Sequence, residues 1–357
     1  AIENVNEIRK HNSAYTPRDI GHSTKYDKLR PDRYGILGAS IGTLTRELET
    51  NNDDAIIKRY QYIIIDEAHE RSVQLDLTLI SLFNLLTRCE NRDDCPFVVL
   101  ASATFDEHVF LDFFGVPRET NFIWCRGAPQ PIDERWSFMG DHTSSDYLKT
   151  CADAVNDIVR DGSDADVTTG TDVLIFLPGK PEMQALRDLL EPLRVGLVRR
   201  DPAAAFDIIL LESSVVNEYS RDYQRIFNAI SDSRVVVDGK QYVPTRRIIL
   251  STNVAETGLT LSGLRYVIDS GYAREVEYNA TVNAAGLLTR PAPQSRIWQR
   301  RGRAGRNAPG VFYPTYPRHV YDRLQLVQYP DIVTGSAIDL VIMKLAAEQY
   351  RGVDDPT

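Results

Sequence analysis

Residues 60–72 read YQYIIIDEAHERS, a short and nearly continuous apolar run that ends on two adjacent acids, Asp66 and Glu67. Such a run is typical of a strand that is buried on both faces, as in a parallel sheet. Ligands bind beyond the carboxyl ends of strands in open parallel sheets, so both acids stand where a ligand would bind. One acid can hold Mg²⁺ through water and the other can orient an attacking water. Taken alone, such a pair is more often two solvated charges at a strand end than a catalytic pair.

Similar apolar runs recur along the chain and alternate with segments of helical periodicity. Further strands are expected at residues 97–104, 173–178, 246–252 and 265–271, and helices at residues 73–87 and 180–190. This alternation predicts an α/β fold built from parallel strands. Extra material at residues 205–245 contains VVVDGKQYV, which predicts a hairpin insertion that turns at Asp238 and Gly239.

The composition excludes some classes of protein. No apolar run approaches the roughly 18 residues that span a membrane, and the start of the chain is polar, so neither a membrane partner nor a signal peptide is expected. The net charge of −9 argues against wrapping nucleic acid by bulk charge, although it is compatible with a local basic groove. The four cysteines form no CxxC pair, which predicts buried or incidental thiols in a reducing compartment.

Four stretches in order give the chain a family resemblance. They are DEAHERS at 66–72, SAT at 102–104, STNVAETGLT at 251–260 and QRRGRAGR at 299–306. They resemble motifs of the DEAH/RHA branch of superfamily 2 helicases, and the resemblance covers residues 20–310. It implies two RecA-like parallel-sheet lobes in tandem, followed by the start of a winged-helix domain. The divergent third stretch and the insertion fit a viral member of the family.

The first of these stretches carries the catalytic acids of the family. The resemblance implies that Asp66 is the Mg²⁺ ligand and that Glu67, also beside the metal, is the general base. It implies that His69 couples the nucleotide site to the second lobe. In the second stretch, Ser102 and Thr104 would link hydrolysis to domain movement through hydrogen bonds.

The fourth stretch, QRRGRAGR, contains the cations that the family directs at the nucleotide. The resemblance implies that Gln299 positions the attacking water and that Arg303 and Arg306 reach the γ-phosphate as arginine fingers. Guanidinium forks match the charge that develops on phosphoryl oxygens. Arg301 stands where relatives often carry a small residue or Lys, and it is given no role.

The third stretch resembles the motif that contacts the nucleic-acid backbone. Thr252, Asn253 and Thr260 would contact sugar and phosphate, which positions a strand without reading its bases. Glu256 and Thr257 would help to close the cleft between the lobes. Gly258, assigned to the nucleotide site, replaces the usual serine of relatives and so removes a hydroxyl contact there.

Weaker matches fill the gaps between these stretches. Gly179 would lie near the nucleic-acid backbone, and Ser40 would replace a threonine that contacts it. Phe227 resembles a phenylalanine that stacks on adenine, although a core role fits it also. Lys25 aligns with an RNA-contacting arginine, and a solvated surface lysine fits equally well. Residues 281–298 should hold a β-hairpin that acts as a wedge against the strand.

The expected domain boundaries follow from these motifs. Residues 1–130 would form the first lobe, with its N-terminal part missing, and residues 131–325 the second lobe. Residues 326–357 would begin the winged-helix segment. The phosphate-binding string GxxxxGK[ST] is absent from the chain. We expect it upstream in a longer parent protein, and we expect this chain alone to hydrolyse ATP poorly.

The resulting hypothesis is an ATP-dependent helicase core that uses ATP or another NTP with Mg²⁺. Its expected partner is single-stranded RNA or an RNA duplex with a single-stranded tail, and DNA is the alternative substrate. A catalytically inactive module that binds nucleic acid or a protein partner is the alternative function. The expected location is inside the cell, in the cytoplasm or nucleus. The sequence does not indicate whether a protein cofactor takes part.

Overall fold

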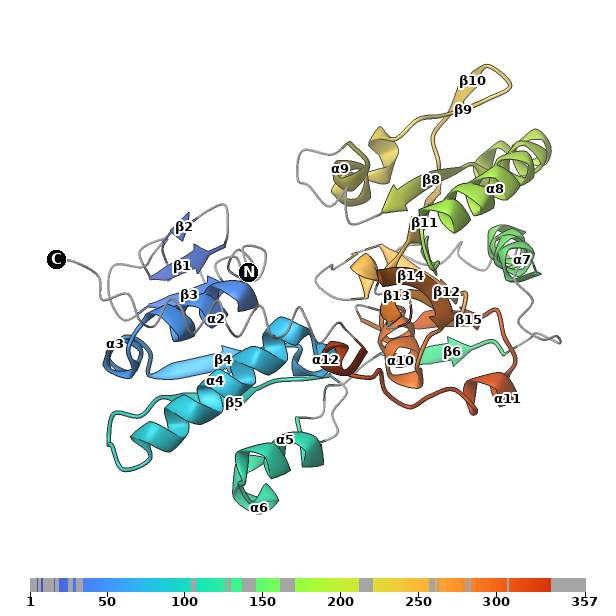
Figure 1. Cartoon of the computed structure of the whole chain (residues 1–357). Helices are drawn as coiled ribbons and strands as arrows, with labels where there is room; N and C mark the ends of the chain where they lie inside the picture. Colours follow the sequence, from blue (N-terminus) through green and yellow to red (C-terminus); the bar gives the residue numbers. More distant parts are fainter. Residues whose placement is uncertain are drawn as a thin grey trace. The chain divides into compact units, whose positions relative to one another are not determined.

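The computed structural model contains two units, whose helices and strands are labelled in Figure 1. Each unit has its own apolar core. Unit 1 comprises residues 1–124, 277–286 and 329–357, and unit 2 comprises residues 125–276 and 287–328. The structure describes residues 5, 8, 16, 19–24, 28–29, 35–103, 107–125, 127, 130–136, 146–160, 171–211, 221–256, 261, 263–279, 281, 284–306 and 308–334.

Unit 2 is built on a six-stranded sheet in the order β6-β15-β12-β7-β11-β8, and all its strand pairs are parallel. The strands are β6 (Ile132–Glu134), β7 (Asp172–Phe176), β8 (Phe206–Leu211), β11 (Arg246–Ser251), β12 (Leu264–Asp269) and β15 (Gly310–Pro314). Every residue of β7, β11 and β15 is buried, and β8 and β12 are nearly so. The parallel sheet and the two-sided burial that the sequence predicts are therefore confirmed in this unit.

Helices cover both faces of this sheet. α7 (Asp146–Arg160) and α8 (Lys180–Arg200) pack on one face, against alternate residues of the strands such as Val173 and Ile175. α9 (Arg221–Phe227) and α10 (Gln294–Gly302) pack on the opposite face, against Leu174 and Phe176. α11 (Arg318–Tyr321) follows β15. Two apolar layers therefore enclose the sheet in the described part of unit 2.

The described part of residues 1–124 in unit 1 contains two small sheets. The first joins β1 (Ile20–Ser23), β2 (Lys28–Leu29) and β3 (Ile36–Ala39), and the second is the parallel pair β4 (Tyr62–Ile65) and β5 (Phe97–Leu100). The described helices of unit 1 are α2 (Ile41–Thr50), α3 (Asp53–Arg59), α4 (Val73–Cys89), α5 (Glu107–Phe114), α6 (Arg118–Asn121) and α12 (Asp331–Thr334). α4 begins at the N-cap Ser72, whose hydroxyl accepts the Leu75 N–H at 3.3 Å.

The expectation of two-sided burial is wrong for β4 and β5. Ile63 and Ile65 are buried in the unit 1 core, but Tyr62 and Ile64 on the other face are 56% and 67% exposed. β5 alternates in the same way, with exposed residues at Phe97 and Val99. The helices of the core cluster cover one face of this pair, and the apolar run alone did not distinguish one covered face from two.

The two predicted hairpins have different outcomes. β9 (Val235–Val237) and β10 (Lys240–Tyr242) pair as expected, and Asp238 and Gly239 turn between them with φ of 50° and 75°. The second hairpin joins β13 (Tyr272–Asn279) to β14 (Ala284–Pro291). It begins nine residues earlier than expected, and the last residues of the expected range belong to α10, which runs from residue 294 to residue 302.

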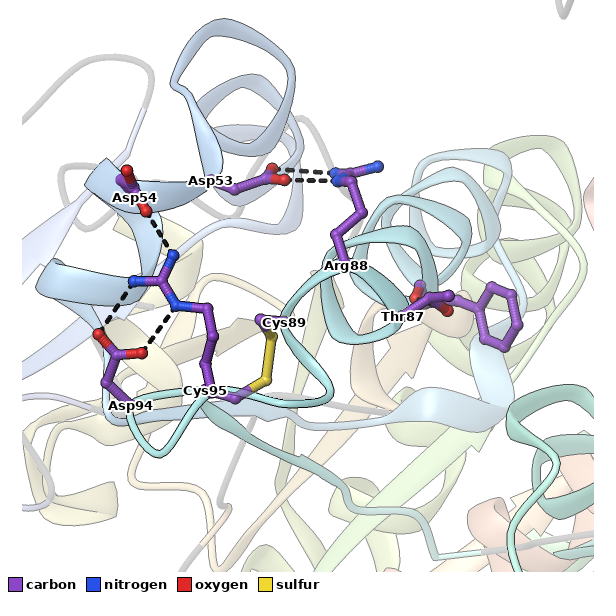
Figure 2. The surroundings of a disulfide bond; sticks show 9 residues. Asp53, Asp54, Thr87, Arg88, Cys89, Asp94 and Cys95 are labelled. Carbon is purple, nitrogen blue, oxygen red and sulfur yellow. Dashed lines mark hydrogen bonds and ion pairs between the residues drawn. A yellow bond between two sulfur atoms is a disulfide. The ribbon is translucent and has the colours of Figure 1, made fainter.

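The cysteines also require a correction. Cys89 at the end of α4 and Cys95 before β5 form a disulfide, with their Cα atoms 5.6 Å apart, so these two are not the thiols expected from the sequence (Figure 2). Cys125 is exposed, and Cys151 is a buried thiol whose pKa burial raises. Beside the disulfide, Arg92 donates to Asp54 at 2.5 Å and to Asp94 at 2.9 Å, and Arg88 binds Asp53 (Figure 2). In the part of the chain that is described, no helix has both the length and the apolarity to cross a bilayer.

Candidate functional site

The two predicted catalytic acids lie directly after β4, at its carboxyl end. Asp66 is exposed, and its Oδ1 accepts the backbone N–H of Glu67 at 2.9 Å. Glu67 has φ 54° and ψ 41°, in the left-handed region that a residue with a Cβ rarely adopts. This backbone turns the chain away from the strand at once, into the 3₁₀ turn η1 (Ala68–Glu70).

Hydrogen bonds connect this turn to the end of the neighbouring strand β5. The N–H of Ala68 donates to the carbonyl of Ala101 at 3.0 Å. Nδ1 of His69 is 2.9 Å from Oγ of Ser102, and its Nε2 is 3.5 Å from Oε2 of Glu67. His69 therefore bridges the proposed base and the residue that the sequence assigned to coupling.

The protonation of His69 is set by opposing effects. Burial lowers the pKa of its imidazole below the ordinary value of 6.5, and the carboxylates of Glu67 and Asp66 oppose this. Burial dominates, so the ring is neutral at pH 7. A neutral ring carries one N–H and one acceptor nitrogen, which suits a bridge between a hydroxyl and a carboxylate.

The residues present fit a magnesium ion that is shared with phosphate. Asp66 and Glu67 offer carboxylate oxygens, which are the protein ligands that Mg²⁺ prefers. Among the described residues, no group of three acid, histidine or cysteine side chains could hold a metal by itself. Mg²⁺ commonly uses one or two carboxylates together with waters and substrate phosphates. The acids therefore suit an ion that arrives with a nucleotide.

In unit 2, the predicted nucleic-acid contacts gather at the carboxyl ends of β7 and β11. These strands pair in parallel, with Phe176 opposite Ser251, so Gly179 and Thr252 follow at the same edge of the sheet. Thr252 is half-buried and Asn253 is exposed. This edge of the sheet therefore holds a hydroxyl, an amide and a glycine.

Gly179 leaves room for an arginine that the sequence reasoning did not select. A Cβ on Gly179 would lie 2.5 Å from Nη1 of Arg274. Arg274 donates to Oε1 of Glu182 at 3.0 Å, and its Nε is 3.5 Å from Oγ1 of Thr289 on β14. The glycine thus lets the guanidinium rest on the backbone of this loop.

The predicted motif at 299–306 forms the second half of α10 and the turn that follows. Gln299 is half-buried on the helix, Arg303 is its half-buried C-cap residue, and Arg306 is exposed. Nη2 of Arg303 donates to the backbone carbonyl of Glu256. The structure thereby brings the third and fourth stretches together.

The remaining predicted residues are not part of these groups. Ser40 occupies the N-cap position of α2 without a capping hydrogen bond from its side chain, and its hydroxyl is 2.9 Å from that of Thr43. Phe227 ends α9, is 50% exposed and has its ring centroid 5.0 Å from that of Tyr223 in a tilted arrangement, so it is not the core residue of the alternative interpretation. Five residues lie outside the described part of the chain: Lys25, Thr104, Thr257, Gly258 and Thr260.

A buried ionic cluster beside α10 was not predicted. Arg296 and Arg300, one turn apart on the helix, bind Glu256, and Arg300 also binds Asp269. Arginines spaced by four residues within a helix share a face, and this signal in QSRIWQRR was available from the sequence. Their partners Glu256 and Asp269 could not be predicted from the sequence, because they lie on other elements.

Comparison with known proteins agrees with these motifs. The family described as Helicase conserved C-terminal domain matches residues 230–308. B962L, a candidate RNA helicase of African swine fever virus, is 37% identical over 344 residues, which cover 94% of this chain and 35% of that protein. The human ATP-dependent RNA helicase DHX33 is 26% identical, over 92% of this chain and 42% of its own length. This chain therefore spans about a third to two fifths of these relatives.

Solved structures share the fold. A crystal structure of the Escherichia coli DEAH/RHA helicase HrpB matches with a TM-score of 0.69 and 22% identity, over 99% of this chain and 40% of that one. The expected RecA-like α/β fold is thereby confirmed. The expected winged-helix start lies largely beyond residue 334, outside the described residues.

Proposed function

Because this chain belongs to the DEAH/RHA group of superfamily 2 helicases, we propose that it forms the motor lobes of an ATP-dependent RNA helicase. The observation that carries the proposal is the placement of Asp66 and Glu67 at the carboxyl end of β4, joined through His69 to Ser102. Acids at this edge can act on a phosphate. Through its contacts with Glu67 and Ser102, His69 can couple a movement of Glu67 to the end of β5.

In this proposal each acid has a distinct task. Asp66 holds Mg²⁺, which, when bound, neutralises charge on the phosphate oxygens of the nucleotide. Glu67 orients the attacking water and accepts its proton. Its side chain is 37% exposed, so water can reach it. His69 holds Glu67 in place and passes its position to Ser102.

Unit 2 supplies the cations and the grip on RNA. Arg303 and Arg306 stabilise the charge of the transferring phosphoryl group, and Gln299 positions the water. Gly179, Thr252 and Asn253 contact the sugar–phosphate backbone without reading bases, so the grip would be tolerant of sequence.

The test of this proposal is Glu67→Gln in the full protein that carries this chain. Loss of the base should lower the turnover of ATP by about 100-fold or more, while fluorescent nucleotide still binds. Glu90→Gln is the matched control, because Glu90 is an exposed glutamate at the far end of α4. Unchanged turnover in Glu67→Gln would remove Glu67 from this role.

The substrate is tested with the wild-type protein. RNA with a single-stranded tail should stimulate hydrolysis more than DNA of the same sequence, since contacts to the 2′-hydroxyl separate the two. Stimulation by DNA alone would favour the alternative substrate. RNA binding without any hydrolysis would favour an inactive binding module.

A further inference from the structure

One arginine of α10 is fully buried and holds two carboxylates at once. Arg300 is 1% exposed. Its Nε donates to Oε1 of Glu256 at 2.7 Å, and its Nη1 donates to Oδ1 of Asp269 at 2.6 Å and to the carbonyl of Tyr272 at 3.1 Å. The guanidinium also lies over the ring of Phe176, with Cζ 5.1 Å from the centroid. Such a network holds the helix by its buried side.

Both carboxylates depend on this arginine because both are buried. Glu256 is 5% exposed and Asp269 is fully buried, and an unpaired carboxylate there would lose its hydration without compensation. The hydroxyl of Tyr316 and the N–H of Gly271 also donate to Asp269, at 2.5 and 3.2 Å. Burial alone would lower the pKa of Arg300, but Glu256 and Asp269 raise it above its ordinary value. A lysine could not reproduce this charged fork.

Glu256 connects Arg300 to the proposed arginine finger. Its Oε1 is bound by Arg300, and its Oε2 lies 3.0 Å from Nε of Arg296. Its backbone carbonyl accepts from Arg303. One residue is therefore held by three arginines, two through its side chain and one through its main chain. A displacement of Glu256 would therefore disturb this contact of Arg303.

We infer that Arg300 is a positioning residue, which fixes Glu256 and through it the guanidinium of Arg303. The inference rests on the proposed function, because hydrolysis is what gives the orientation of Arg303 a catalytic consequence. Charge that is oriented before the reaction stabilises a transition state without further reorganisation. Loss of Arg300 should therefore reduce kcat and leave KM for the nucleotide little changed.

The first experiment compares three substitutions in the full protein. Arg300→Lys should lower kcat by about 10- to 100-fold, as expected for a misplaced catalytic group, with KM changed less than about twofold. Arg301→Lys should leave kcat unchanged, because the described contacts of Arg301 are with Glu134 and Trp298. Arg247→Lys breaks an equally buried pair at the amino end of β11, where Arg247 lies 2.9 Å from Asp172. An equal loss in Arg247→Lys would overturn the inference, because general destabilisation would then explain it.

A double-mutant cycle tests the route through Arg303. If Arg300 acts by orienting Arg303, the doubly substituted protein Arg300→Lys with Arg303→Lys should lose about as much kcat as the worse single variant. Losses that multiply would mean that the two arginines act independently, and the inference would fail.

Hydrogen exchange supplies a readout that does not require activity. In Arg300→Lys, amides of residues 252–256 and 300–304 should exchange faster than in the wild type, and in Arg301→Lys they should not. Unchanged exchange in Arg300→Lys would overturn the inference. If the wild-type protein does not hydrolyse ATP, the proposed function is refuted. The exchange rates in Arg300→Lys would then be the test of whether Arg300 holds Glu256 and Arg303 in place. Normal turnover in Arg300→Lys, with an active wild type, would refute the inference and leave the function standing.

Discussion

At the scale of single residues, the backbone of Glu67 stores strain at the proposed base. Its left-handed conformation, with φ 54°, costs a residue with a Cβ roughly 1 to 2 kcal/mol. Glu67→Gly should therefore unfold at higher urea than Glu67→Ala, with a free energy of unfolding about 1 kcal/mol greater. Both variants lack the carboxylate, so the comparison isolates the backbone.

The matched pair of substitutions is at Glu70 in the same 3₁₀ turn. Glu70 is not among the described residues with positive φ, so alanine should be the more stable replacement there. If the alanine variant were more stable than the glycine variant at both positions, the backbone of Glu67 would store no strain.

The close approach of Arg274 to Gly179 leads to a second residue-scale prediction. Gly179→Ala places a Cβ where Nη1 of Arg274 now lies, so the guanidinium must move away from Glu182. We expect RNA affinity, measured by fluorescence anisotropy, to fall by up to about tenfold, or about 1.4 kcal/mol. Gly196→Ala is the control, because its added Cβ meets no atom within 4 Å. Equal affinity in both variants would place RNA elsewhere.

Which residues the sequence could predict depended on the distance between partners along the chain. Asp66, Glu67 and His69 are neighbours in one string, so their association followed from the string itself. Arg300 is 44 residues from Glu256 and 31 from Asp269, and no local pattern links them. The burial that makes this cluster consequential exists only after β11, β12 and α10 have packed together.

At the scale of elements, the Cys89–Cys95 disulfide joins the end of α4 to the start of β5. Closing this short loop should stabilise unit 1 by about 2 kcal/mol, mainly by restricting the unfolded chain. Dithiothreitol should therefore lower the melting temperature, and Cys95→Ser should lower it without any further effect of reductant. Cys125→Ser, which removes an exposed free thiol, should respond to reductant as the wild type does. A melting temperature indifferent to reductant would contradict the bond.

How well the sequence predicted the burial of a strand depended on which helices cover that strand. The apolar runs of β7 and β11 correctly indicated strands buried on both faces, because helices cover each side of that sheet. The equally apolar run of β4 indicated the same and was wrong. An apolar run predicts that a strand has a buried face. Whether one face or both are covered depends on which other segments pack against the strand. The start of the β13–β14 hairpin was misplaced because AREVEYN carries charges that hid its strand pattern.

At the scale of the whole molecule, each unit carries some of the residues named in the proposed function. Asp66 and Glu67 belong to unit 1, and Gln299 and Arg303 to unit 2. That these residues act on one nucleotide remains a prediction from the order of motifs along the sequence. Each unit has its own apolar core, so each should also have its own stability.

This division leads to a prediction for calorimetry of the whole chain. We expect two unfolding transitions, with unit 2 melting at the higher temperature, because its central strands are buried on both faces while β4 and β5 are buried on one. Reduction of the Cys89–Cys95 bond should shift only the lower transition. Arg247→Lys should shift only the upper one, since the Arg247–Asp172 pair lies inside unit 2. A single transition that responds to both changes would mean that the two cores unfold as one cooperative structure.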